Sequence, residues 1–222
     1  MLFFSLFFAE LLLLFFLSRN LTRVLSFFFF RLSKSKKFTI TAIAILFFPG
    51  TLLHELAHAL FAGLLGVHVG KMEFIPQIEG EKVKLGSVQI GQSDPIRRFF
   101  IGAAPFFLGT ILLLLILFYT VKQQFFNNIS VVIFVGYLVF EIGNTMFSSK
   151  KDMEGALELF VTLIILTIVF YLMGIRIPSF NPNNFLVQPN IEDVFKQGSL
   201  FLLVPLAIDS IVIFLFKPVS RK

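Results

Sequence analysis

The hydrophobic pattern divides the chain into six long apolar runs separated by short polar connections. Each run has about the 20 residues that a helix needs to cross roughly 30 Å of hydrocarbon. The six expected spans lie near residues 1–18, 38–67, 98–121, 129–148, 154–175 and 198–217. The pattern therefore predicts an all-α membrane protein, a polytopic bundle of about six transmembrane helices.

Three features modify this simple picture. The run 38–67 is too long for one straight crossing and contains Pro49-Gly50, which predicts a kink or break. The stretch 21–37 is interrupted by charge, so we expect it to form an amphipathic helix at the membrane surface. The first run lacks a basic start and a small-residue cleavage site, which favours a retained span over a removed signal peptide.

The connection between the second and third spans differs from the rest of the chain in its pattern of polar and apolar residues. Two alternating stretches, 68–76 and 82–90, flank the turn-like Glu79-Gly80, which predicts a β-hairpin at the membrane surface. Asp94-Pro95 then has the residue types of a helix cap and first helical position.

Nothing in the pattern requires a second domain. The irregular stretch 176–190 is expected to be a surface loop. We therefore expect one membrane-embedded domain over residues 1–222, with its core in 38–175 and the hairpin at about 68–90.

Composition agrees with a membrane protein. The chain is 57% hydrophobic and 14% charged, with 33 phenylalanines, which a soluble domain of 222 residues does not need. It has no cysteine, which excludes a disulfide framework and thiolate chemistry. The net charge of +6 lies mostly in the connections that flank the spans, so nucleic acid is not an expected partner. The two sides of the expected bundle carry nearly equal numbers of Lys and Arg, so charge does not fix the orientation.

Three ionisable residues interrupt the second run, in the sequence HELAH (54–58). His54 and His58 are four residues apart, so a helix places both on one face, where they can bind one metal ion. Glu55 can reach a water on that metal and act as a general base, as in the H-E-x-x-H metallopeptidases. The alternative is that all three are polar groups satisfied by hydrogen bonds inside a helix bundle.

Two histidines leave a catalytic zinc one protein ligand short. Asp152 and Glu154 stand at the start of the fifth span, behind a possible capping residue, Ser149. Asp152 is a candidate ligand, although a first-turn acid can equally serve to complement the helix dipole. Glu154 is about 200° from Asp152 around a helix, so joint ligation is not expected. His68, at the start of the hairpin, is a less favoured alternative.

These features resemble the site-2 protease family, the intramembrane zinc metalloproteases. The likeness rests on HELAH within a span, the surface hairpin, Gly-Ala-Ala-Pro (102–105) opening the next span, and an Asn eight residues before an Asp. Of the family motif N-x-x-P-x-x-x-L-D-G, the chain matches the Asn and the Asp but has Phe147, Lys151 and Met153 at the other positions, so it looks like a divergent, small member. The resemblance implies that the zinc ligands are His54, His58 and Asp152. It also implies Glu55 as the general base and Asn144 as a substrate or oxyanion contact.

The expected function is therefore hydrolysis of peptide bonds in membrane-spanning protein substrates, through a zinc-activated water within the lipid bilayer. An exposed hairpin edge could hold the unwound substrate as an added strand. The resemblance implies a prokaryotic cell membrane and an active site towards the cytosolic side. Alternatives are a non-catalytic transporter or binding partner with an ion site, and a zinc peptidase acting on prenylated or soluble peptides. Three further acids within the spans are functional candidates without a partner motif: Glu10, Glu141 and Asp209.

Overall fold

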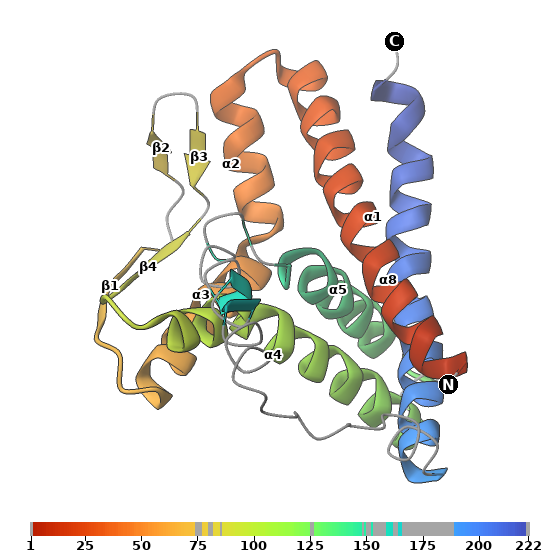
Figure 1. The fold of residues 1–222 in the computed structure, drawn as a ribbon. Coiled ribbons are helices and arrows are strands. Elements are labelled where there is room, and N and C mark those ends of the chain that lie inside the picture. The colour runs from red at the N-terminus through yellow and green to blue at the C-terminus, as the bar shows by residue number, and fades with distance from the viewer. Residues whose placement is uncertain are drawn as a thin grey trace.

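The computed structural model describes residues 2–73, 77–79, 82–84, 86–124, 127–147, 149, 152, 159–161, 164–165 and 189–220. Most of them are helical (Figure 1). The helices are α1 (Leu2–Ser33), α2 (Lys36–Leu46), α3 (Phe48–Leu64), α4 (Pro95–Lys122), α5 (Ile129–Thr145) and α8 (Pro189–Ser220). The strands are β1 (Val69–Glu73), β2 (Gln77–Glu79), β3 (Lys82–Lys84) and β4 (Ser87–Ile90).

The described helices have the length and apolar character of a membrane protein, but they do not support six spans. Three helices are long and apolar enough to cross a membrane alone, namely α1, α4 and the part of α8 from Ile191 to Lys217. The pair α2 and α3 passes the same test together, which brings the number to at most four. Helix α5 has 17 residues, or about 25 Å, which is shorter than the hydrocarbon layer. The expected fifth span, 154–175, lies almost wholly outside the described residues.

The predicted surface helix over residues 21–37 is wrong, because α1 continues as one helix to Ser33. Leu21, Val24 and Leu25 are buried and pack in one cluster with residues of α2 and α8. This burial extends the helix beyond the apolar run. The chain then turns at Lys34, whose φ is 51°, before α2 begins.

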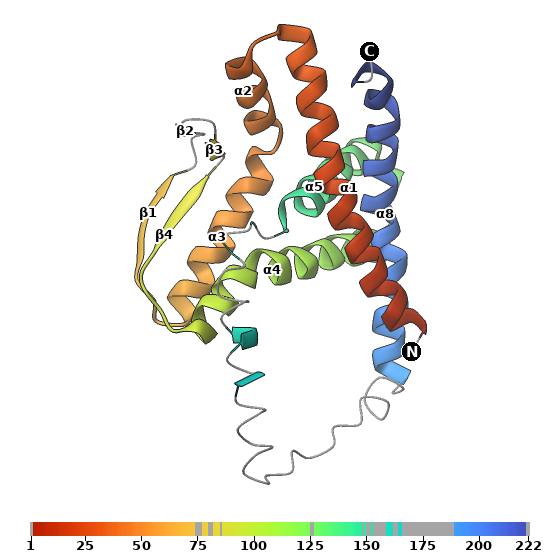
Figure 2. The same cartoon turned by 45° about the horizontal axis from the view of Figure 1, so that its top comes forward.

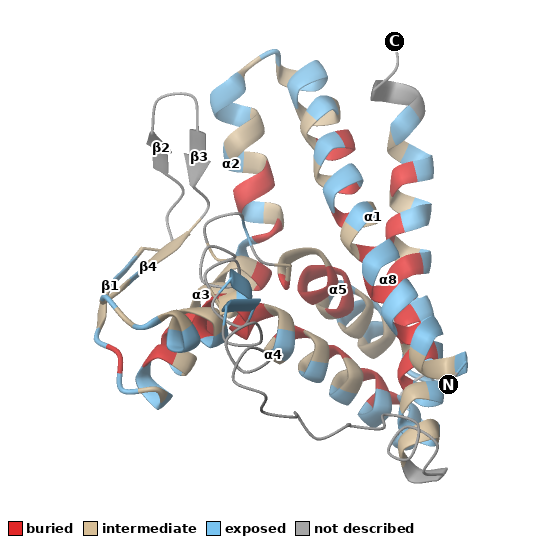
Figure 3. Ribbon diagram, viewed as in Figure 1, coloured by how far each residue is buried: buried red, intermediate tan, exposed pale blue. Residues whose placement is uncertain are grey.

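Helices α1 and α8 run parallel and side by side (Figures 1 and 2). The rings of Phe7 and Phe195 lie 5.5 Å apart near one end, and those of Phe28 and Phe216 lie 4.7 Å apart near the other. The two helices therefore keep one register along their length. Buried positions follow α1 along its length (Figure 3), and six of them recur at alternating intervals of four and three residues, as in a coiled-coil seam. These positions are Phe7, Leu11, Leu14, Ser18, Leu21 and Leu25.

The hairpin is confirmed in its topology, with shorter strands than predicted. Strand β1 pairs antiparallel with β4, and β2 pairs antiparallel with β3. The register shifts between Val69 and Met72, and such irregularities bend and twist a ribbon. Strand β4 lies against α3, as their contacts show.

Two local predictions in the helices are confirmed. The second run breaks into α2 and α3 with a bend of 68° at Phe47, just before Pro49. Asp94 caps α4, since its carboxylate accepts the backbone N–H groups of Ile96 and Arg97 at 3.1 and 3.0 Å. The Arg97 amide, above all, lowers the pKa of Asp94. Of the predicted loop 176–190, only residues 189 and 190 are described, and they belong to α8.

Candidate metal centre

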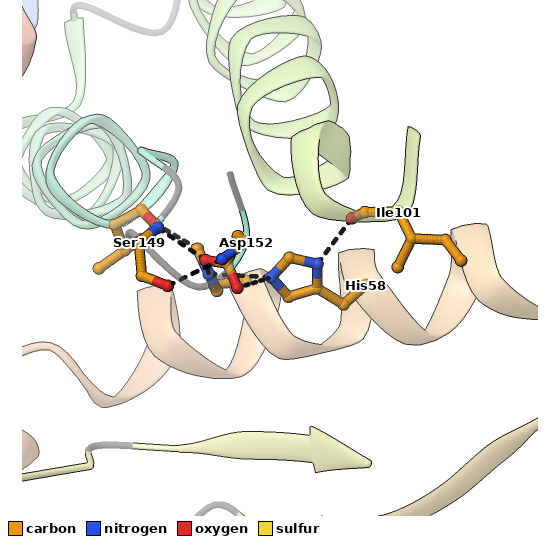
Figure 4. Close-up of polar contacts among 6 residues, drawn as sticks. His58, Ile101, Ser149 and Asp152 are labelled. Carbon is orange, nitrogen blue, oxygen red and sulfur yellow. Dashed lines mark hydrogen bonds and ion pairs between the residues drawn. The ribbon is translucent and has the colours of Figure 1, made fainter. Parts of the chain in front are cut away.

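The two histidines of HELAH lie one turn apart on α3, and the ring of each contacts a backbone carbonyl, as Figure 4 shows for His58 and Ile101. The Nδ1 atom of His54 lies 2.6 Å from the Thr145 oxygen, and that of His58 lies 2.7 Å from the Ile101 oxygen. A carbonyl only accepts, so each Nδ1 donates its N–H to it, and in a neutral ring the Nε2 atom then keeps a lone pair. These two Nε2 atoms lie 3.2 Å apart. Two neutral imidazoles in this arrangement would present two acceptors that a cation could bind.

Asp152 completes a group of three ligands. Its Oδ2 lies 3.6 Å from His54 Nε2, and its Oδ1 lies 3.6 Å from His58 Nε2. A tetrahedral zinc with bonds of about 2.0–2.1 Å needs ligand atoms about 3.3–3.4 Å apart. The two distances to Asp152 involve different carboxylate oxygens. With one ligand atom taken from each residue, the three atoms lie within 4.8 Å of one another, so the group could hold a metal ion.

The carboxylate of Asp152 is fixed by its own short segment and by α4. The Ser149 N–H donates to Asp152 Oδ2 at 2.6 Å, and the Asp152 N–H donates to Ser149 Oγ at 3.3 Å (Figure 4). The backbone carbonyl of Asp152 lies against Gly102, where no side chain would fit. Burial would by itself raise the pKa of Asp152, but the adjacent His54 and His58 rings and the Ser149 hydroxyl hold it well below its usual range.

Glu55 lies beside the three ligands at the wall of a cavity of about 690 Å³. Most residues between Gly86 and Ser93, a stretch that includes β4, also line this cavity. A Cβ atom at Gly86 would lie 3.2 Å from Glu55 Cγ, and the Val88 backbone amide hydrogen-bonds the Glu55 carboxylate. The strand that the sequence predicted as a surface hairpin therefore reaches the proposed base directly.

Asn144 also lines the cavity, but its side-chain amide is tied to the bundle. Its Nδ2 donates to Asp209 Oδ1 at 2.7 Å and to the Phe140 carbonyl at 2.9 Å. Its backbone carbonyl accepts the Ser18 hydroxyl at 3.0 Å. Asp209 thus has a partner that sequence reasoning did not find, while the substrate or oxyanion role of Asn144 stays a prediction.

The remaining candidates lie apart from this group. Glu141 accepts the Gly50 N–H at 3.0 Å, and Glu10 is buried on α1, where its Oε2 has no partner among the described residues. His68 does not join the three ligands, and Glu154 lies outside the described residues.

Sequence reasoning missed the carbonyls of Thr145 and Ile101, which orient the histidines. A backbone carbonyl belongs to every residue type, so no sequence signal marks these two. No protein-family model, curated protein or solved structure matches this chain.

Proposed function

We propose that the protein is a zinc metalloprotease that hydrolyses peptide bonds of membrane-spanning substrates. The observation that carries this proposal is the convergence of His54, His58 and Asp152 around one point, with Glu55 beside them at a cavity wall. Two imidazole nitrogens and one carboxylate oxygen are ligands that suit zinc, and three protein ligands leave a fourth position for water.

Each residue of the centre has a role that its position supports. Zinc bound here would act as a Lewis acid and lower the pKa of a bound water towards about 7. Glu55 would take a proton from that water and deliver it to the leaving amine. The carbonyls of Thr145 and Ile101 would keep the two imidazoles in the tautomer and orientation that ligation needs.

Hydrolysis requires water at the metal centre, although the surrounding helices are apolar. The polar residues that line the cavity could hold this water. The lining includes the hydroxyl groups of Thr22, Thr51, Ser87 and Ser93. A spanning helix hides its carbonyls in its own hydrogen bonds, so a substrate must unwind locally before cleavage. Strand β4 lines the same cavity and could bind the unwound segment as an added strand.

The setting of the reaction is part of the proposal. The apolar helices indicate a lipid bilayer, and the resemblance to site-2 proteases favours a prokaryotic cell membrane with the centre towards the cytosolic side.

Replacement of Glu55 by Gln tests the proposed function. Because Glu55 is not a ligand, the purified Glu55→Gln protein should keep about one zinc per chain while peptide hydrolysis falls about 100-fold or more. Metal analysis and cleavage of a spanning peptide measure the two quantities. Comparable cleavage by the variant would remove Glu55 as the base. Zinc in both proteins with hydrolysis by neither would instead indicate a non-catalytic metal site.

A further inference from the structure

The break between α2 and α3 disrupts the helical hydrogen bonding, including the bond that Gly50 would make. In a continuous helix the Gly50 N–H would donate to the Leu46 carbonyl, four residues earlier. The 68° bend separates the two groups. Both then need other partners, because an unpaired backbone group in an apolar surrounding is costly.

Helix α5 supplies both partners from one face. The Gly50 N–H donates to Glu141 Oε2 at 3.0 Å, and the Leu46 carbonyl accepts the Tyr137 hydroxyl at 3.3 Å. Tyr137 and Glu141 are four residues apart, so they lie one above the other on the helix. The two halves of the broken hydrogen bond are thus satisfied by adjacent turns of a single neighbour.

The same face of α5 reaches the metal centre one turn later, where the Thr145 carbonyl accepts the Nδ1–H of His54. All three pairs have the same sequence separation of 91 residues. A constant separation means that α5 runs parallel to the broken span, with one contact per turn. We call this row of contacts the α5 ladder: Tyr137 to Leu46, Glu141 to Gly50, and Thr145 to His54.

The ladder has little freedom to slide. A Cβ atom at Gly50 would lie 2.7 Å from Thr145 Cγ2 and 2.8 Å from the Glu141 carbonyl oxygen. The backbones of α3 and α5 are therefore in close contact at the middle contact of the ladder. A shift of α3 along α5 would move the His54 ring relative to the carbonyl that orients it.

We infer that Glu141 is a positioning residue for the metal centre, which fixes α3 against α5 and thereby aims His54. This inference rests on the proposed function only in that the centre binds metal. Glu141 does not line the described cavity wall and is not one of the three ligands, so it acts through the backbone. Its Oε1 has no partner among the described residues. One acceptor oxygen is enough for this role, so a glutamine should replace it.

The test measures zinc affinity of the full chain in detergent, by competition with a chelator, and the absorption spectrum of the Co²⁺-loaded protein. Glu141→Gln should keep the wild-type affinity within about twofold. Glu141→Leu should bind zinc about 10-fold more weakly or worse, the range typical of residues that orient a metal ligand. Tyr137→Phe should weaken binding in the same direction by a smaller factor. Glu10→Leu is the matched control, because it removes another buried acid outside the ladder and should leave zinc affinity unchanged.

Each outcome decides the proposal. Wild-type affinity in Glu141→Leu would overturn it, as would a glutamine variant as weak as the leucine variant. If the leucine variant does not fold, weakened binding in Tyr137→Phe beside intact binding in Glu141→Gln supports the ladder, and any other combination overturns it. A wild-type protein that binds no zinc would remove the metal centre and the proposed function with it. Normal wild-type binding with an unaffected Glu141→Leu would remove only the positioning role.

Discussion

Gly102 of α4 lies so close to the backbone carbonyl of Asp152 that any side chain at this position would overlap it. Asp152, the third candidate ligand, can therefore pack against α4 only because Gly102 has no side chain. This contact joins the Gly-Ala-Ala-Pro stretch to the segment that follows α5, and it explains why a small residue is needed at the start of the third expected span.

Gly102→Ala should displace Asp152 from the two histidines. We expect zinc affinity to fall about 10-fold or more, because the carboxylate can no longer meet both imidazoles. Chelator competition on the purified chain measures the effect. Gly136→Ala on α5 is the matched control, since a Cβ atom there meets nothing within 4 Å. An alanine at position 102 that binds zinc normally would show that this packing against α4 is dispensable.

Asp152→Ala should lose zinc and activity together, whereas Glu154→Ala should retain both. Three protein ligands make an open catalytic tetrahedron, and the alanine at 152 leaves only the two histidines. A capping role for Asp152 would predict only a small loss of stability, typically 0.3–1 kcal/mol. Metal content and peptide hydrolysis of both variants separate these cases. Zinc bound by Glu154, His68 or Glu141 in place of Asp152 would contradict the assignment.

The structure identifies which strand of the hairpin could pair with an unwound substrate. The sequence alone directs a proline test to Val83 or Leu85, but the strand that lines the cavity is β4. The Gly91 N–H donates to the His68 carbonyl at 2.9 Å, so in an antiparallel ladder the preceding Ile90 N–H points away from β1. This N–H is available to pair with an added strand.

Ile90→Pro should therefore impair cleavage of spanning substrates by about 10-fold, the effect of losing one or two hydrogen bonds to the substrate. Short soluble peptides, which need no such strand, should be cleaved nearly as well as by the wild type. Initial rates on the two substrate types give the comparison. Equal losses on both would indicate misfolding or a different docking surface.

Asp209→Leu should destabilise the bundle, because it leaves a partly buried amide hydrogen of Asn144 without its acceptor on α8. The expected cost is about 1–3 kcal/mol, measured by thermal unfolding in detergent. Asp209→Asn keeps an acceptor oxygen and should cost less. A leucine variant as stable as the wild type would show that the Asn144–Asp209 hydrogen bond contributes little.

Local signals predicted the fold where neighbouring residues decide the structure. The break at Pro49-Gly50 follows from a missing N–H, and the start of α4 follows from a cap at Asp94. The length of α1 could not be predicted in this way. Arg19 and Arg23 interrupt the apolar run, yet both are exposed on the side away from the α1–α8 seam, and α8 supplies the burial that continues the helix.

The candidate site likewise combines features that local sequence predicts with features that depend on distant contacts. The four-residue spacing of His54 and His58 is enough to predict that both face one point. The third candidate ligand comes from a distant segment, so the residues alone left Asp152 with a ligand role and a helix-dipole role as alternatives, and the resemblance favoured the ligand. The contact of Glu141 with Gly50 spans 91 residues and could not be predicted from either residue type. The Gly50 N–H needs an acceptor from another helix only because the helix bends.

The parallel pairing of α1 with α8 has a consequence for biosynthesis. Of the described helices, α1 is made first and α8 last, so their seam closes only after every helix between them has been synthesised. Contacts between such distant segments form slowly. Asp209 reaches Asn144 at this final stage, so the cavity wall is completed after the rest of the bundle.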